Sequence, residues 1–252
     1  MVALHNLSAT AHMTLTRQAP AIIRDLGRAE YAPVFAAMRA FTDARDTATQ
    51  DELWIVEHLP VFTLGLGADR SHVLAAHDVP VIQTDRGGEV TFHGPGQVVI
   101  YLLIDLRRNK PGGKLYAKQF VHKIEQAIIE VLAAYNLDGE RIAGAPGIYL
   151  AGGERKGAKI AALGLKVRGN GCTYHGVSLN VAMDLAPFSW INPCGYAGLA
   201  TVDMRSLGVT AALADVQQAL AHELVRQLAT ISLLEPAEQL TEARLGAQPH
   251  DS

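Results

Sequence analysis

The sequence of 252 residues predicts an α+β (α/β) fold, a single domain in which helices flank a mixed, largely antiparallel sheet. Three observations lead to this prediction. Runs rich in β-forming residues come in clusters, three isolated segments carry apolar residues at helical spacing, and the run 97–106 (QVVIYLLIDL) is almost entirely apolar. Such a run is expected of a strand covered on both faces. Strand clusters between separate helices are typical of α+β architecture.

Three helices are predicted, over residues 31–45, 115–137 and 212–228. Their apolar stripes are Val34, Phe35, Met38 and Phe41; Phe120, Ile124, Ile128, Val131 and Tyr135; and Leu213, Val216, Leu220 and Leu224. Thr210 is the expected N-cap of the third helix. Stripes of this kind indicate a face buried in the core rather than a cofactor site.

The strands are predicted from β-forming composition and alternation. They cover residues 53–59, 61–65, 88–94, 97–106, 147–150, 159–167 and 177–185. In the third of them, alternation puts Val90 and Phe92 on one face and Glu89, Thr91 and His93 on the other.

Composition and charge restrict the class of protein. Hydrophobic residues make up 49% and charged residues 19%, and the net charge of −3 gives no sign of a nucleic-acid binder. The N-terminal residues lack the pattern of a signal peptide, and no run approaches the ~18 apolar residues of a membrane span. We therefore expect a cytoplasmic protein. Residues 1–20 are interpreted as an extension, 21–235 as the domain and 236–252 as a polar tail.

The two cysteines, Cys172 and Cys194, are expected to be free thiols in a reducing compartment. They form no CxxC pair, so a zinc site has little support, and we expect neither a metal nor a cofactor. Cys194 lies in the turn-rich segment FSWINPCGYAG, where a thiol can be presented to a cleft. Near a cation such a thiol ionises more readily and becomes a nucleophile, although the segment can equally be a plain turn.

The segment RGGEVTFHGPGQ, residues 86–97, places four glycines and a proline around one short strand. Glycine allows a backbone to approach a ligand closely, and Arg86 and His93 add polar side chains. The segment matches neither the Walker loop nor GxGxxG. It is interpreted either as a ligand-binding loop or as a hairpin with glycine turns.

Two further segments carry candidate polar groups. In KIAALGLKV, alternation puts Lys159 on the same face as Ala161, Leu163 and Leu165. Its ammonium either reaches water at the strand end or is partly desolvated, with a lowered pKa. In GCTYHGVSLNV, His175 precedes the predicted strand and is either a substrate ligand or a satisfied turn histidine.

Taken together and in this order, RGGEVTFHGPGQ, GAPGIYL, KIAALGLKV, TYHGVSLNV and INPCGYAG resemble the lipoyl(octanoyl) transferases. These are the octanoyl-[acyl-carrier-protein]:protein transferases of lipoate biosynthesis. The resemblance spans roughly residues 22–228. It implies the fold of the biotin and lipoate protein ligase catalytic domains, and makes residues 21–235 an octanoyltransferase catalytic domain.

The resemblance also assigns site residues. It implies Cys194 as the nucleophile and Lys159 as its partner, and it makes Cys172 an unsuitable nucleophile. It implies a substrate site built from three segments: Arg86, Gly87, Gly88, Glu89, Val90, Thr91, Phe92 and His93; Ala162, Leu163 and Gly164; and His175, Gly176 and Val177.

The expected reaction is transfer of octanoate, or of a lipoyl group, from acyl carrier protein to a lysine of a lipoyl domain through a Cys194 thioester. The implied acceptors are the lipoyl domains of 2-oxoacid dehydrogenase E2 subunits and the glycine cleavage H protein. Backbone N–H groups near Leu163 and Gly164 are candidates for an oxyanion hole. We expect a monomer, with no nucleic-acid or membrane partner. A basic cluster of Arg107, Arg108, Lys110 and Lys114 is either a carrier-docking patch or a solvated loop.

The alternatives come from different classes. An ATP-dependent lipoate or biotin protein ligase of the same fold would need a nucleotide and no cysteine. A non-catalytic carrier-binding protein would have no use for both Cys194 and Lys159. A metal site from His93, His175 and a cysteine lacks the usual ligand spacing.

Overall fold

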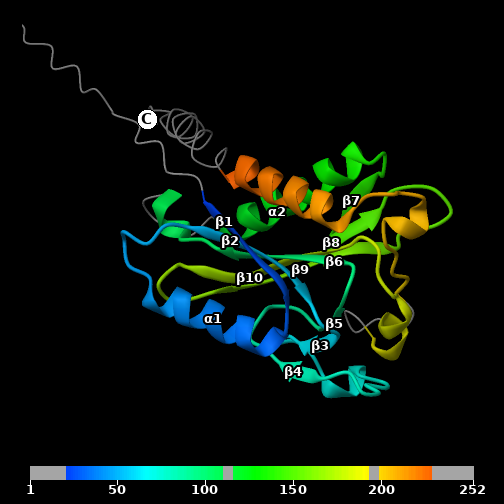
Figure 1. Cartoon of the computed structure of the whole chain (residues 1–252), viewed down its shortest axis with the longest axis horizontal. Coiled ribbons are helices and arrows are strands. Elements are labelled where there is room, and N and C mark those ends of the chain that lie inside the picture. The colour runs from blue at the N-terminus through cyan, green and yellow to red at the C-terminus, as the bar shows by residue number, and fades with distance from the viewer. Residues whose placement is uncertain (1–20, 110–115, 193–198, 229–252) are drawn as a thin grey trace, which may run out of the picture.

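The computed structural model describes residues 21–109, 116–192 and 199–228. In these ranges the chain forms a seven-stranded sheet and a three-stranded sheet, with helices on both faces of the larger one (Figure 1). The strands and helices are β1 (Ile22–Ala29), α1 (Tyr31–Ala44), β2 (Glu52–His58), β3 (Val61–Leu64), β4 (Val81–Gln83), β5 (Val90–His93), β6 (Gln97–Leu103), α2 (Tyr116–Ala134), β7 (Gly139–Ile142), β8 (Ala145–Leu150), β9 (Lys159–Val167), β10 (Thr173–Asn180) and a last helix over residues 213–228.

The larger sheet has the order β1-β2-β6-β10-β9-β8-β7, and only the pair β1–β2 is parallel. The smaller sheet has the order β4-β3-β5, with β3 parallel to β4 and antiparallel to β5. Short connections between sequential strands favour this antiparallel pairing. The predicted class, a mixed and largely antiparallel sheet flanked by helices, is confirmed.

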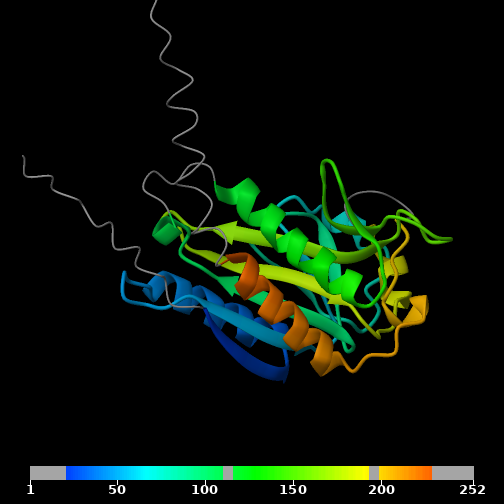
Figure 2. The same cartoon turned by 90° about the horizontal axis from the view of Figure 1, so that it is seen from above.

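The two faces of the larger sheet are buried by different helices. One face packs against α2 and the helix 213–228, which lie side by side in both views (Figures 1 and 2). Phe120 and Ile124 from α2 and Leu220 from the last helix meet Ile100 and Leu102 of β6 there. All three predicted stripes therefore face the core.

The opposite face carries α1, whose Tyr31, Val34 and Met38 pack on Val99 and Tyr101 of β6. The small sheet forms a third hydrophobic cluster next to that of α1. Apolar residues shortly after β10 and in the turn before residue 192 also belong to this cluster. In Figure 1 the small sheet lies below the end of the large one, next to α1. The space between these layers is where the site develops.

Three sequence predictions were wrong in detail. The last helix begins at residue 213, so Thr210 is not its N-cap. β10 begins at Thr173, so Tyr174, His175 and Gly176 belong to the strand and do not precede it. The strands β1, β4 and β7 were not predicted. β1 lies at the sheet edge and pairs on one side only, so its outward residues are polar and its apolar alternation is weak.

Among the helices in the described ranges, none combines the length and apolarity that a membrane span requires. The expected N-terminal extension and C-terminal tail lie outside the described residues.

Candidate active site

A cavity of about 570 Å³ lies along β9, where the large sheet, α2 and the small sheet meet. It is lined by Lys159 and by all the residues expected at the substrate site except Phe92. Phe92 points the other way and packs against Phe62 and Phe188 in the core of the small sheet. The structure thus brings three distant segments of the sequence together around one hollow.

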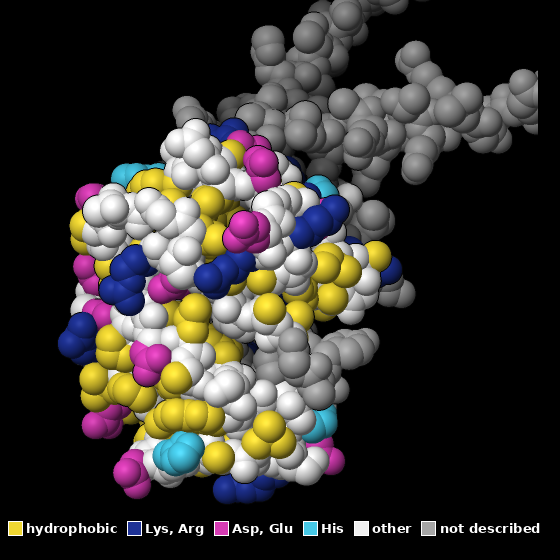
Figure 3. Space-filling view, turned by 90° about the vertical axis from the view of Figure 1, so that its right-hand side faces the viewer, with side chains coloured by type: hydrophobic (Ala, Val, Ile, Leu, Met, Phe, Trp, Pro, Cys, Tyr) yellow, Lys and Arg dark blue, Asp and Glu magenta, His cyan; other side chains and the backbone are white. Residues whose placement is uncertain are grey.

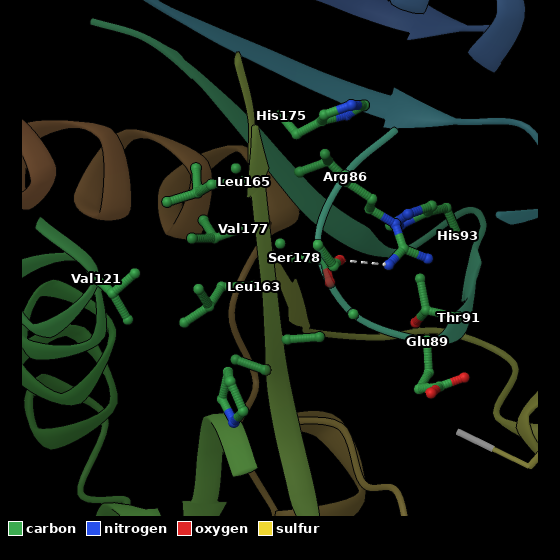
Figure 4. Close-up of a pocket in the computed structure, with 18 of the residues that line it drawn as sticks. Arg86, Glu89, Thr91, His93, Val121, Leu163, Leu165, His175, Val177 and Ser178 are labelled. Carbon is green, nitrogen blue, oxygen red and sulfur yellow. Dashed lines mark hydrogen bonds between the residues drawn. The ribbon is translucent and has the colours of Figure 1, made fainter. Parts of the chain in front are cut away.

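The cavity has two sides because β9 runs through it (Figure 4). Val121, Leu163, Leu165 and Val177 lie on the side of α2, which we call the outer compartment. Val121, Leu163 and Leu165 are half-buried and Val167 at its rim is 44% exposed, whereas Val177 is 2% exposed.

The side that faces α1 and the small sheet is the inner compartment, and Figure 4 shows Arg86, Thr91 and His93 there. Its lining includes Val99 and Tyr101, which are 2% and 4% exposed. The inner compartment is therefore the enclosed part of the cavity, whereas the outer compartment is open.

The two compartments communicate at an opening in the sheet edge. β8 pairs with β9 only as far as Ala161, which leaves the rest of this edge of β9 without a neighbouring strand. Gly87 N–H then donates to Leu165 O (2.9 Å), so the loop 86–88 closes the far end. Alternate residues of a strand direct their N–H and C=O to the same edge. The main chain of Leu163 therefore faces the opening, whereas Gly164 faces β10.

Glycine is required where the loop crosses β9. A Cβ on Gly164 would lie 2.8 Å from Gly87 O and 3.3 Å from the Arg86 side chain. A Cβ on Gly65 would lie 2.1 Å from Gly88 O. The glycine-rich segments therefore allow the loop to lie directly on two strands, which fixes the wall of the inner compartment.

Arg86 is a buried cation beside this wall. Its guanidinium donates to Thr63 O (2.6 Å), to Thr63 Oγ1 (2.9 Å) and to Gly87 O (3.0 Å). These bonds fix the planar group on β3 and fasten the loop to the small sheet. The positive charge also lowers the pKa values of the neighbouring His93 and His175, after burial, which is the larger cause for both.

His93 is held by a chain of hydrogen bonds. Gln97 Nε2 donates to Phe92 O (3.2 Å) and to Asn180 Oδ1 (2.9 Å), so Gln97 Oε1 accepts from His93 Nδ1–H (2.7 Å). Asn180 in turn donates to Val202 O (3.0 Å). Burial lowers the pKa of His93 to about 3. The ring is therefore neutral at physiological pH.

His175 adopts a left-handed backbone conformation with φ of 60°, which is strained for a residue with a side chain. Its Nε2–H donates to Asp85 (2.9 Å), which also accepts from the Tyr174 hydroxyl. Burial lowers the pKa of His175 to about 4. Burial alone would raise the pKa of Asp85, but these two hydrogen bonds hold it below its usual value.

Lys159 is buried, 9% exposed, and lines the cavity. Its neighbours Ala158 and Ile160 belong to the core on the α2 side, and a register shift in the β8–β9 pairing sets Lys159 opposite Tyr149. Its side chain therefore lies on the other face of β9 from Ala161 and Leu163, and the alternation expected from the sequence was wrong at this residue.

Lys159 Nζ donates to Pro146 O (3.0 Å) and lies 5.3 Å from the centre of the Tyr149 ring. The side chain is withdrawn from solvent, so the ammonium does not simply reach into water at the strand end. Its main chain bonds Ala200 O and Val202 N, which joins β9 to the residues after 198.

Glu125 on α2 supports this arrangement from behind. Its carboxylate accepts from Gly147 N–H (3.3 Å) and from Arg141 (3.1 Å), and it is 7% exposed. Gly147 has φ of 125°, and a Cβ there would lie 2.7 Å from the Lys159 Cε atom. Glu125 thus holds the turn that presents Pro146 O to Lys159.

Cys194 lies outside the described residues. The chain on either side of it is described: Asn192 N–H donates to His72 O (2.8 Å), and Lys159 N–H donates to Ala200 O (2.8 Å). Phe188 and Thr201, which precede and follow the segment 193–198, both line the cavity. The two ends of the Cys194 segment are therefore anchored at the cavity, one of them on Lys159.

Cys172 is buried near Asp105, and burial raises the pKa of its thiol. It lines no part of the cavity. Within the described parts of the chain, no three His, Cys, Asp or Glu side chains are grouped so as to hold a metal ion.

The sequence reasoning missed several groups that build the site. Tyr31, Gln97 and Tyr101 line the cavity, and Asp85 and Glu125 support its residues. Asp85 directly precedes the glycine-rich segment and Gln97 ends it, so both could have been found. Tyr31 and Tyr101 lie in apolar stripes, where nothing in the pattern separates a cavity wall from the core.

Residues 30–225 match the family model of the lipoyl protein ligase A/B catalytic domain. An octanoyltransferase of Herminiimonas arsenicoxydans is 70% identical over 207 residues, which cover 82% of this chain and 96% of that protein. The chain belongs to the lipoyl protein ligase A/B catalytic domain family. An octanoyltransferase of Janthinobacterium sp. (strain Marseille) is 68% identical, with the same shares covered. The resemblance inferred from the motifs is confirmed, and so are the acyltransferase class and octanoyl transfer in lipoate biosynthesis.

A solved structure in this family's fold is that of a bi-partite lipoate protein ligase and its E2 lipoyl domain from Thermoplasma acidophilum. It has a TM-score of 0.65 and 12% sequence identity, and the match covers 83% of this chain and 84% of that one. At this identity the likeness shows the shared fold alone, and it agrees with the fold expected from the motifs.

Proposed function

We propose that the chain takes the octanoyl group from the thioester of acyl carrier protein, holds it on Cys194 and passes it to a lysine of a lipoyl domain, with Lys159 as the partner of the thiol. Lipoyl-domain proteins are the protein substrates that the family implies. One observation carries the mechanism: the buried ammonium of Lys159 lies at the cavity, and its own main chain anchors one end of the segment that bears Cys194.

The first step exchanges one thioester for another. The Cys194 thiolate attacks the carbonyl carbon, a new C–S bond forms, and the bond to the carrier thiol breaks, with the electron pair leaving on the carrier sulfur. A cation beside the cysteine favours the thiolate. The Lys159 ammonium donates to Pro146 O, and its buried position strengthens its interaction with a nearby anion.

In the second step the acceptor lysine, as a neutral amine, attacks the acyl-enzyme. A C–N bond forms, the C–S bond to Cys194 breaks, and a proton leaves the attacking nitrogen. Lys159 in its neutral form serves as the base for that proton. Conversion of a thioester into an amide is downhill, so the scheme needs neither nucleotide nor metal.

The carbonyl oxygen gains negative charge in both steps. Leu163 N–H faces the opening between the two compartments, whereas the N–H of Gly164 is directed at β10. We assign Leu163 N–H as the donor to the oxyanion and exclude Gly164 from that role. A fixed backbone donor of this kind stabilises the transition state without reorganisation.

The sequence also suggested a cluster of four basic residues as a docking patch for the carrier protein. Arg107 donates to Asp105 (3.1 Å), and Arg108 donates to main-chain oxygens of residues 46–49 and lies 3.8 Å from Asp51. Both charges therefore serve the local structure first, while Lys110 and Lys114 lie outside the described residues. This weakens the interpretation of the four as a carrier-docking patch. The monomeric state and the cytoplasmic location stay predictions.

Mass spectrometry of the intact protein tests the proposal. After mixing with octanoyl-acyl carrier protein, and without ATP, we expect a mass gain of one octanoyl group on the native chain and on Cys172→Ser, the matched control. Cys194→Ala should gain no mass and transfer no octanoate to a lipoyl domain. Loading of Cys194→Ala at the native rate, or a requirement for ATP and free octanoate, would overturn the scheme.

A further inference from the structure

The inner compartment is shaped like a channel along the strands. Its floor is the face of β9, β10 and β6 that is turned toward α1. The register places Ala162, Ser178 and Val99 side by side on one rung, and Gly164, Gly176 and Tyr101 on the next. Small residues on β9 and β10 leave space above the floor, whereas Tyr101 fills it at the second rung.

The length of this floor is comparable to that of an acyl chain. The Lys159 ammonium lies level with Ala161, because a Cβ built on Gly147 would be 3.2 Å from Lys159 Nζ and 2.6 Å from Ala161 O. Gly164 lies three residues beyond Ala161, about 10 Å along a strand that rises about 3.3 Å per residue, which is close to the length of an extended octanoyl chain. A group attached to a sulfur near the Lys159 ammonium and extending along the floor would therefore reach the rung of Tyr101.

The inner compartment accepts hydrocarbon despite its polar side chains. The Tyr101 hydroxyl, His93 Nδ1 and the Gln97 amide are bonded within the wall, and His93 and His175 are neutral because burial lowers their pKa values. The rings of Tyr31 and His93 lie parallel, with centroids 6.0 Å apart. His175 Nδ1 is buried without a hydrogen-bond partner among the described residues, so it is the exception in a wall whose other bonded groups lose no partner when a hydrocarbon chain enters.

The far end is braced from behind. His58 is fully buried; its Nδ1–H donates to Ala29 O (2.9 Å), so its Nε2 accepts from the Tyr101 hydroxyl (2.7 Å). The His58 ring also lies 5.2 Å from the Tyr31 ring. Burial raises the pKa of Tyr101, so its hydroxyl stays a donor. Tyr101 and Tyr31 are therefore fixed in place and not free to swing aside.

We propose that Tyr101 and Tyr31, braced by His58, form the end wall that limits the length of the acyl chain. This inference rests on the proposed function, because it takes Cys194 as the point from which the chain extends. It assigns acyl-length selection to two residues outside the three segments expected at the substrate site. A chain longer than octanoyl would have to displace a ring that is hydrogen-bonded to the scaffold.

A competition experiment tests the end wall. The protein is mixed with equal amounts of hexanoyl-, octanoyl-, decanoyl- and dodecanoyl-acyl carrier protein, and the acyl-enzymes are separated by mass. The ratio of dodecanoyl to octanoyl adducts does not depend on how much of the protein is folded. We expect Tyr101→Val and Tyr31→Ala to raise this ratio at least about tenfold over the native chain, since each extra buried methylene is stabilising.

Two variants control for other effects. Tyr101→Phe keeps the ring and loses only its hydrogen bond, so the native ratio should be retained within about threefold. Phe41→Ala removes a partly buried ring from the same side of α1, next to Trp54 and not at the cavity, and should leave the ratio unchanged.

The outcomes separate the two proposals. If the native chain forms no octanoyl adduct, the proposed function fails. If the native chain and the variants all form octanoyl adducts but the ratio of Tyr101→Val and Tyr31→Ala stays at the native value, only the end wall is overturned. An equal rise in the ratio for Phe41→Ala would also overturn it, because the effect would then be general loosening of the core.

Discussion

The two sides of β9 are built from the same strand and have opposite characters. On the outer side Leu163, Leu165 and Val167 line the cavity and are half-buried or exposed (Figure 3 shows apolar side chains exposed among charged ones on one face of the molecule). On the inner side Ala162 and Gly164 face an enclosed space lined by rings. Large residues at alternate positions of β9 face one side and small residues at the positions between them face the other, because successive side chains of a strand point to opposite faces.

Under the proposed function, a single strand would serve both the acceptor lysine of a protein partner and the hydrocarbon chain. Large residues on the outer side complete the core with α2. Small residues on the inner side leave room that a larger side chain would occupy. The two sides meet at the opening in the sheet edge. This opening lies between the end of the β8 pairing and the bond from Gly87 to β9.

The largest effect is expected at that meeting point. Lys159→Met keeps the length of the side chain and removes the charge, so kcat for octanoyl transfer should fall at least about a hundredfold. The main-chain bonds to Ala200 and Val202 do not involve the side chain, so the fold should be retained, as a thermal melt would show. Activity within about threefold of native would remove Lys159 from the reaction.

A middle effect is expected from filling the inner side. In Gly164→Val the new side chain would press on Gly87 O and Arg86, and the loop 86–88 would have to move. We expect kcat/KM to fall about tenfold to a hundredfold, because small displacements of positioning groups are costly. Leu163→Ile, the neighbouring change on the outer side, keeps the volume and should cost far less. Equal losses from both changes would argue against two distinct sides.

The last effect concerns stability rather than activity, and it involves two histidines of the inner side. His93 and His175 have pKa values of about 3 and about 4 in the folded protein, below the usual 6.5 of an unfolded histidine. Between the folded and the unfolded pKa values, the unfolded state binds more protons than the folded state. The contribution of these histidines to the free energy of unfolding is therefore fully present above about pH 6.5 and is lost as the pH falls toward 4. Each histidine should contribute about 1.4 kcal/mol per pH unit in that window.

Denaturant titrations across this pH range would check the prediction. His175→Asn removes one of the two titrating rings and should reduce the slope of stability against pH. His77→Asn, on an exposed loop outside the cavity, is the matched control and should leave the slope unchanged. A native chain of constant stability from pH 4 to pH 7 would contradict the buried neutral state of these rings.

Much of the fold was predictable because the residues that a helix or strand buries recur in the sequence at a regular spacing. The three helical stripes and the strands from 53 to 103 face the core as the alternation indicated. The edge strand β1 escaped because Arg24, Asp25 and Arg28 interrupt its apolar residues, and two of them pair with Glu52 and Glu57 on β2. The start of β10 escaped because the strained His175 resembles a turn residue.

The site was predictable to the extent that its chemistry used unusual residues. Gly87 and Gly88 and the polar Arg86 and His93 signalled a close approach, the family resemblance added Gly164, and all of them line one cavity. Tyr31, His58 and Tyr101 gave no such signal, because an aromatic residue in a helix or strand fits equally well into an ordinary core. Only three-dimensional proximity separates these two uses.

The chain that bears Cys194 is tied at one end, through His72, to the turn 70–72 that follows β3, and at the other to the large sheet, through Lys159. An acyl group bound there would lie where the two sheets already meet, near the bonds from Gly87 to Leu165 and from His175 to Asp85. Loading the enzyme should add contacts at this junction, so that the acyl-enzyme resists heat and proteases better than the empty enzyme. The acyl-enzyme would then be the most stable form of the protein.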